Sequence, residues 1–136
     1  MNDAGYAKPL PTPSIDSKPY WDGLKEGRLM LQKCGDCGAV RHYPRPVCDQ
    51  CYSMEVEWIE AAGTGTIHTW TVSHHAFHPA FKGETPTTYA TIDLAEGVRL
   101  CVRLKMDAGE PYVGMPVKLG FEPVADDLMA PVATPV

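Results

Sequence analysis

The sequence has little basic character and no long apolar run. Its twelve lysines and arginines are scattered singly and stand against seventeen acidic residues, which leaves a net charge of −5. Proteins that bind nucleic acids usually concentrate a basic excess on one face, so this balance argues against a nonspecific polyanion binder. A small anionic ligand is still compatible, because it needs only two or three cations.

The sequence also lacks the patterns that send a protein into or across a membrane. No stretch approaches the roughly 20 apolar residues of a membrane-spanning helix. The polar residues after Met1 contain neither the basic nor the apolar region of a secretory signal. The unpaired Cys101 suits a reducing compartment. We therefore expect a cytoplasmic protein that binds neither membrane nor nucleic acid.

Four of the five cysteines form two C-x2-C pairs, the clearest chemical signal in the chain. Each pair brings two thiols within reach of one ion, and the ten residues between the pairs suffice for a hairpin. Four thiolates suit a tetrahedral divalent ion, most often zinc, and leave no coordination position open for catalysis. The spacing predicts a structural metal site formed by Cys34, Cys37, Cys48 and Cys51.

Two alternatives remain open for these cysteines. Disulfides would suit an oxidising compartment, and iron also accepts four thiolates, which would make the site a redox centre. Residues 28–52 are too few to bury a core, so a metal must supply the folding energy, on the order of 10–16 kcal/mol. Gly38 after the first pair lets backbone N–H groups turn toward sulfur, whereas Tyr52 takes the corresponding place after the second.

A short amphipathic helix is predicted ahead of the cysteines. Ser17 is a candidate N-cap, Pro19 suits the first turn and Gly27 suits the end of the helix. Tyr20 and Trp21 share its apolar face and pack on the chain itself or contact a partner. Before the helix, three prolines and little apolar periodicity are typical of an extended or mobile arm.

The second half of the chain is typical of β-structure. Residues 66–72, 87–94 and 98–104 show strand patterns, and a further strand points Val117, Leu119 and Phe121 inward. Several short strands separated by glycine turns predict a small barrel or sandwich. We expect the small residues and two prolines at the end to form a disordered tail. The predicted segments are an arm over 1–16, a helix over 17–27, a metal ribbon over 28–62, a β-domain over 63–124 and a tail over 125–136.

Motifs along most of the chain follow an order shared with a known family. They are YWDG at 20–23, LQKCGDCG at 31–38, YPRPVCDQC at 43–51, Trp58, GTGTI at 63–67 and AEGVRL at 95–100. In this order they resemble the bacterial and archaeal acyl-CoA-associated proteins that join a rubredoxin-like zinc ribbon to an OB-fold, long described as a domain of unknown function. The likeness runs from about Ser17 to Val124 and departs from the family pattern at Tyr52. It implies a mostly β chain with an N-terminal helix, a zinc ribbon and a small OB-fold barrel.

The resemblance also implies a function. Members of this family look like accessory subunits rather than independent enzymes. They accompany thiolase-fold proteins such as thiolases, steroid side-chain aldolases and acyltransferases, and sometimes hydratase-like domains. For this chain the resemblance implies structural zinc, a hetero-oligomer with a thiolase-fold enzyme subunit, an acyl-CoA thioester as shared ligand, and no catalytic residue of its own.

Four arginines are candidate contacts for CoA. Arg99 and Arg103 lie on the outward face of a predicted strand, about 13 Å apart, which suits an extended ligand better than a single phosphate. Arg41 and Arg45 on the ribbon are candidates for meeting a nucleotide phosphate. The alternative for each of the four is a surface charge that serves solubility.

A histidine-rich segment is the main candidate for contact with a partner. His68, His74, His75 and His78 fall within eleven residues. Exposed aromatic residues on a loop commonly anchor interfaces, which favours a contact there. The alternatives are a solvated loop, a second metal site or a general acid–base. The candidate contact residues are Tyr20 and Trp21 of the helix and His74, His75, Phe77, His78 and Phe81 of the loop.

Two rival functions belong to other classes. A nucleic-acid-binding ribbon and OB-fold would need aromatic stacking platforms beside a basic groove. Trp70 and Tyr89 are possible platforms, but the acidic balance gives such a groove no support. A stand-alone acyl-CoA carrier or sensor would bind CoA thioesters in the absence of any partner.

Overall fold

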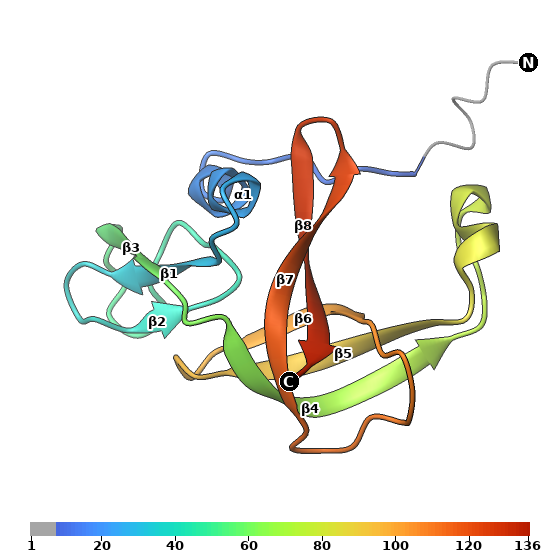
Figure 1. Cartoon of the computed structure of the whole chain (residues 1–136). Coiled ribbons are helices and arrows are strands. Elements are labelled where there is room, and N and C mark those ends of the chain that lie inside the picture. The colour runs from blue at the N-terminus through green and yellow to red at the C-terminus, as the bar shows by residue number, and fades with distance from the viewer. Residues whose placement is uncertain (1–7) are drawn as a thin grey trace, which may run out of the picture.

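A small sheet carrying the cysteines lies beside a closed barrel, with one short helix against both (Figure 1). The structure is a computed structural model and describes residues 8–136, so the first part of the predicted arm lies outside the described residues. Among the described residues, no helix is long and apolar enough to cross a membrane.

The predicted helix is present as α1 (Lys18–Lys25) and ends before Gly27, whose φ of 73° is a conformation that favours glycine. The Ser17 side chain does not cap it. Instead, the Ser14 backbone N–H donates to Ser17 Oγ at 2.9 Å and the Ser17 N–H donates to Ser14 Oγ at 3.2 Å. This reciprocal pair fixes the turn that enters α1.

The ribbon is an antiparallel sheet in the order β2-β1-β3. Its strands are β1 (Met30–Cys34), β2 (Val40–Arg41) and β3 (Val56–Glu60). The first cysteine ends β1, and the second pair lies in the long connection between β2 and β3. The pairing of β1 with both neighbours therefore brings the two cysteine pairs to one end of the sheet.

The barrel closes in the order β4-β5-β6-β8-β7, with β7 pairing back to β4. A short 3-10 helix, η2, lies in the connection between the first two strands. Neighbouring strands are antiparallel except β6 and β8, which run parallel and pair only through Arg103 with Val132 and Leu104 with Ala133. The elements are β4 (Thr64–Ser73), η2 (Pro79–Glu84), β5 (Thr87–Leu94), β6 (Arg99–Leu104), β7 (Pro116–Ala125) and β8 (Leu128–Pro135).

One hydrophobic core joins the helix, the ribbon and the barrel. Leu24 of α1, Leu31 of β1, and Ile92, Leu100 and Val117 of the barrel are fully buried members of the same cluster. The predicted alternation in β6 is confirmed, because every second side chain of this strand is buried. The ribbon therefore has no separate core of its own.

The prediction of a disordered tail over 125–136 is wrong, because β8 is the strand that completes the barrel. It pairs with β7 from Val117 opposite Pro135 to Ala125 opposite Leu128, and its Val132 and Ala133 are buried. The alanines and prolines of β8 carry no alternation of apolar and polar residues, so its sequence shows no strand pattern. Proline is tolerated here because β8 pairs along its length with β7 but over only two residues with β6, which leaves much of one edge free.

Gly65 is required at the seam where β4 meets β5. A Cβ atom there would lie 2.7 Å from Ile92 Cγ2 and would overlap the Asp93 carbonyl oxygen. We expect Gly65→Ala to lower the free energy of unfolding by about 2 kcal/mol, measured by urea denaturation. Gly120→Ala is the matched control, since its nearest neighbour would be Val132 Cγ1 at an ordinary 3.8 Å. Equal urea midpoints for the two variants would contradict the close approach of β5 to Gly65.

Candidate functional site

The four sulfur atoms of the cysteine pairs converge on one point at the end of the ribbon. All lie within 4.8 Å of one another. The separations are 3.5 Å between Cys34 and Cys51 and 3.6 Å between Cys37 and Cys48. A tetrahedral zinc ion with bonds of about 2.3 Å places its sulfur ligands about 3.8 Å apart, so the cluster fits such an ion. These are free thiols, so the disulfide alternative is not realised.

Backbone N–H groups point at the sulfurs of Cys34 and Cys48 and favour the thiolate form of these two cysteines. The N–H of Cys37 donates to Cys34 Sγ and that of Gln50 donates to Cys48 Sγ, both at 3.4 Å. Hydrogen bonds from the backbone at Cys37 and then Asp36 lower the pKa of Cys34 to about 6. Backbone bonds from Gln50 and Cys51 lower the pKa of Cys48 in the same way.

Tyr52 adopts the geometry that Gly38 provides in the other cysteine turn. Its φ is 62°, against 78° at Gly38, and it is the one described non-glycine residue with positive φ. The N–H of each residue donates to the carbonyl of the first cysteine in its pair, at 3.0 Å in both turns. The departure from the family pattern therefore keeps the turn but places a side chain where glycine is favoured.

Arg41 is a structural residue of the ribbon. It is only 4% exposed, so the expectation that it contacts CoA is corrected. Its Nε donates to Gln32 Oε1 at 2.7 Å, and its Nη2 donates to the carbonyl of Arg45 at 3.0 Å. Gln32 Oε1 also accepts from the Arg45 backbone N–H at 2.8 Å. Gln32 and Arg41 together hold the segment that leads to the second cysteine pair.

The other three candidate arginines lie in different surroundings. Arg45 is exposed and its guanidinium forms no ion pair with a described residue. Arg99 donates from Nε to Asp93 at 2.6 Å. Arg45 and Arg99 line a shared groove between ribbon and barrel. Arg103, paired with Glu122 at 3.2 Å, lines a separate cleft.

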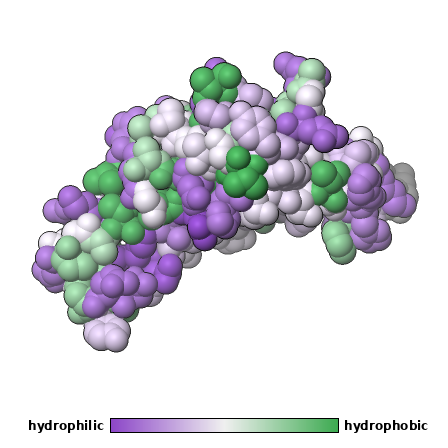
Figure 2. Space-filling model, turned by 90° about the horizontal axis from the view of Figure 1, so that it is seen from below, coloured by the Kyte–Doolittle hydropathy of each residue, from purple (hydrophilic) through white to green (hydrophobic). Residues whose placement is uncertain are grey.

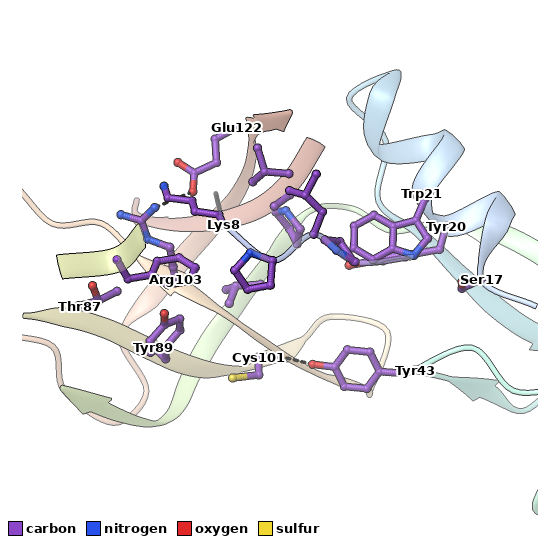
Figure 3. A pocket seen from close by; sticks show the side chains of 18 of the residues that line it. Lys8, Ser17, Tyr20, Trp21, Tyr43, Thr87, Tyr89, Cys101, Arg103 and Glu122 are labelled. Atoms are coloured by element: carbon purple, nitrogen blue, oxygen red, sulfur yellow. Dashed lines mark hydrogen bonds and ion pairs between the residues drawn. The ribbon is translucent and has the colours of Figure 1, made fainter. Parts of the chain in front are cut away.

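The hollow that Arg103 lines has a volume of about 510 Å³ and is called the cleft below. It lies between α1, the ribbon and the outer face of β5 and β6 (Figure 3). The Cys101 backbone N–H donates to the Tyr43 hydroxyl at 3.1 Å, which ties the ribbon to the barrel. Sequence reasoning missed the cleft because its walls are far apart in the chain. Its principal side chains are Trp21, Tyr43, Phe81, Tyr89, Arg103 and Glu122.

The two aromatic residues of α1 have different surroundings. Tyr20 is 5% exposed, and burial, aided by Tyr43, raises the pKa of its hydroxyl. Of the two roles open for Tyr20, packing on the chain itself is the one observed, and its candidate contact with a partner is set aside. It packs against His42, whose ring centroid lies 5.2 Å away. Trp21 is half-buried and lines the cleft.

The histidine-rich loop divides into an outward part and an inward part. Phe77 is 88% exposed and stacks edge-on against His75 with centroids 4.5 Å apart. His78 is occupied locally, because its Nδ1 accepts from the Ala80 N–H at 3.1 Å and caps η2. Phe81 faces the cleft. Among the described residues, only the four ribbon cysteines form a cluster able to hold a metal, so these histidines do not assemble a second one.

A four-cysteine ribbon that shares its core with a five-stranded barrel defines a zinc-ribbon and OB-fold protein. Residues 21–57 match the family model "ChsH2, rubredoxin-like zinc ribbon domain", and residues 58–122 match "ChsH2, C-terminal OB-fold domain". The chain belongs to this ChsH2-like family, known also as DUF35. The expected family, fold class and zinc ribbon are thereby confirmed.

Three similar proteins place the chain within the family. A DUF35 domain-containing scaffold protein of Methanocaldococcus jannaschii is 30% identical, over 79% of this chain and 77% of that protein. A probable enoyl-CoA hydratase alpha subunit of Thermomonospora curvata is 37% identical over 94% of this chain, which spans only 40% of that subunit's length. A solved chain of the Ltp2-ChsH2(DUF35) aldolase is 37% identical with a TM-score of 0.84, covering 93% of this chain and 98% of that one.

Replacing Cys48 with serine removes one thiolate from the cluster. We expect loss of bound zinc, because such sites contribute on the order of 10–16 kcal/mol of binding free energy and depend on all their ligands. Metal analysis of the purified chain should show one zinc per chain for the native protein and almost none for the variant. Cys101→Ser should keep its zinc, since Cys101 lies on β6. Stoichiometric iron in the native protein would overturn the assignment.

Tyr52→Gly should stabilise the ribbon. Removing a side chain from a left-handed conformation relieves a cost of about 1 kcal/mol, and Tyr52 is 79% exposed, so little packing is lost. The reciprocal change Gly38→Ala should destabilise the ribbon by a similar amount. Thermal melts of the zinc-loaded proteins measure both effects, and shifts of the same sign would be inconsistent with matched turns.

Proposed function

We propose that this chain is a non-catalytic accessory subunit of a thiolase-fold enzyme that acts on acyl-CoA thioesters. In this proposal it stabilises the enzyme subunit and helps to shape its acyl-CoA site. The carbon–carbon chemistry takes place on the partner, which supplies the nucleophile and the base. The reduced ribbon thiols suit the cytoplasm, where we place the complex.

The observation that carries the proposal is the match to the aldolase chain, which extends over most of both chains. This chain covers 98% of the solved chain of the Ltp2-ChsH2(DUF35) aldolase, at 37% identity. The same module covers only 40% of the Thermomonospora hydratase subunit. A module that matches 77% of a DUF35 scaffold protein and part of a larger subunit is typical of an accessory unit. The name of that solved structure joins the module to Ltp2 in an aldolase, which favours an aldolase-type partner.

The exposed part of the histidine-rich loop is our candidate contact surface. Phe77 is the most exposed aromatic side chain among the described residues, and His74 and His75 are exposed beside it. An exposed aromatic group is costly in water and commonly anchors an interface. On the underside of the molecule, hydrophobic residues are interspersed with hydrophilic ones (Figure 2).

For the CoA moiety we favour the groove that Arg45 and Arg99 share. It lies between the ribbon and the barrel, has a volume of about 910 Å³ and contains the unpaired guanidinium of Arg45. Arg99 would have to leave its ion pair with Asp93 to bind a phosphate, whereas Arg45 has no such pair to break. Arg103 is held by two carboxylates and is a weaker candidate.

Affinity purification of the tagged chain from its native host tests the proposal. We expect a thiolase-fold protein to co-purify, and we expect acyl-CoA turnover only when both chains are present. Thiolysis or aldol cleavage by the isolated chain would contradict a non-catalytic role. Salt-dependent binding to a single-stranded oligonucleotide without any protein partner would favour the nucleic-acid alternative.

Phe77→Asp should weaken the complex without unfolding the chain. The side chain is 88% exposed, so its loss costs little stability, while an anchoring aromatic contributes about 2 kcal/mol or more to binding. The dissociation constant for the partner, measured by calorimetry, should rise about thirty-fold. Val113→Asp is the control, since Val113 is 70% exposed on a different loop. Equal losses of affinity in both variants would contradict this contact surface.

A further inference from the structure

The proline-rich arm lies along the cleft instead of extending into solvent. Lys8, Pro9, Leu10 and Pro11 are among the residues that line it. In Figure 1 the described part of the arm runs along the top of the molecule, from α1 past the β7–β8 hairpin and toward η2. In Figure 3 the Lys8 side chain lies beside Arg103 and Glu122. The arm therefore forms one wall of the cleft.

The arm is fixed at two ends and held loosely between them. At one end, Lys8 Nζ lies 2.5 Å from Glu84 Oε2 and 5.5 Å from the centroid of the Phe81 ring. At the other end, the Ser14–Ser17 pair joins the arm to α1. Between these points Pro9, Pro11 and Pro13 have no N–H group, so they cannot pair as a strand with the barrel. Side-chain contacts alone hold this segment, and such contacts are readily broken.

Beneath the arm, the barrel strands β6 and β8 are paired over a short length only. Because β6 and β8 pair only at their Arg103–Val132 and Leu104–Ala133 contacts, they separate toward Cys101 and Pro131. The cleft occupies this separation and is walled by apolar groups from both strands and by Trp21, Tyr43 and Tyr89. Its volume of about 510 Å³ lies within the usual range of small-molecule sites, about 300–1,000 Å³.

The charges in the cleft indicate what kind of ligand suits it. They gather at one end, where Arg103 pairs with Glu122 and approaches Glu84 at 3.9 Å. These groups satisfy one another and leave no free cation for a phosphate. The remaining walls are aromatic and aliphatic. A long apolar chain fits such a channel better than a nucleotide does.

We propose that the arm is a strap across the cleft, and that an extended acyl chain enters the cleft when Lys8 releases Glu84 and Phe81. The acyl identity of the ligand rests on the proposed function, whereas the strap itself rests on the contacts of the arm. In this arrangement the acyl chain lies in the cleft and the CoA moiety remains outside it. The strap then sets how easily the site opens.

Cys101 provides a reporter in the cleft, because it is an exposed cysteine that lines it. In the zinc-loaded chain we expect the metal to protect the other four cysteines. We would measure the rate at which N-ethylmaleimide modifies Cys101 in the zinc-loaded full chain, with the site located by peptide mass spectrometry. Lys8→Glu with Leu10→Asp should release the strap and raise this rate about five-fold, the contribution expected of one exposed ion pair and one cation–π contact.

The matched control is Lys18→Glu. Lys18 carries the same charge and also pairs with a carboxylate, Asp22 at 2.6 Å, but on the exposed surface of α1. Its Cys101 rate should equal that of the native chain. Equal rates in the released variant, the control and the native chain, at unchanged zinc content, would overturn the strap.

The ligand is tested with dodecanoate as a partner-free apolar probe. Dodecanoate should slow the modification of Cys101, and at lower concentration in the released variant than in the native chain. Free CoA should have no effect on this rate. Protection by CoA but not by dodecanoate would overturn the assignment of the cleft to an acyl chain.

These outcomes are independent of the partner experiment. If the released variant behaves as expected and no thiolase-fold protein co-purifies, the strap stands and the proposed function fails. If the partner co-purifies and the Cys101 rates are all equal, the proposed function stands and the strap fails.

Discussion

The ribbon keeps its shape because four sulfur atoms meet at one point. Too few residues separate the cysteine pairs to form a core, so the sulfurs and the ion they fit hold the two turns together. Other features depend on that anchor. β1 carries Leu31 into the shared core, Arg41 and Gln32 brace the second turn, and Tyr43 reaches the backbone of Cys101 on the barrel. Without the sulfur cluster, the cleft would lose the wall that Tyr43 provides.

The sequence predicts best where one local rule determines the structure. C-x2-C spacing identifies the ligand set, and the alternation in β6 identifies its buried face, because each depends only on near neighbours in the chain. β8 escaped prediction because its stability comes from pairing with β7, and its own alanines and prolines carry no strand pattern. The role of Tyr20 stayed open, and Arg41 was misplaced, for a related reason. An aromatic or cationic side chain is compatible with surface or interior, and only tertiary packing decides between them.

The cleft could not be predicted from sequence patterns. Its walls come from the arm, α1, the ribbon, η2 and four barrel strands, and no spacing in the chain relates them. Figure 3 shows how Trp21, Tyr43 and Tyr89 face one space although they lie on separate elements. The same holds for the loop histidines. Their clustering in sequence suggested a joint site, yet His78 serves η2 while His75 stays at the surface beside Phe77.

The single core shared by ribbon and barrel couples their thermodynamics. Leu24 and Leu31 pack in the same cluster as Ile92 and Val117, so the ribbon cannot unfold without exposing part of the barrel's interior. A ligand that binds only the folded state raises the melting temperature of everything that folds with its site. The barrel holds no metal ligand, yet its melting temperature should rise with the concentration of free zinc, and calorimetry should record one transition for the whole molecule.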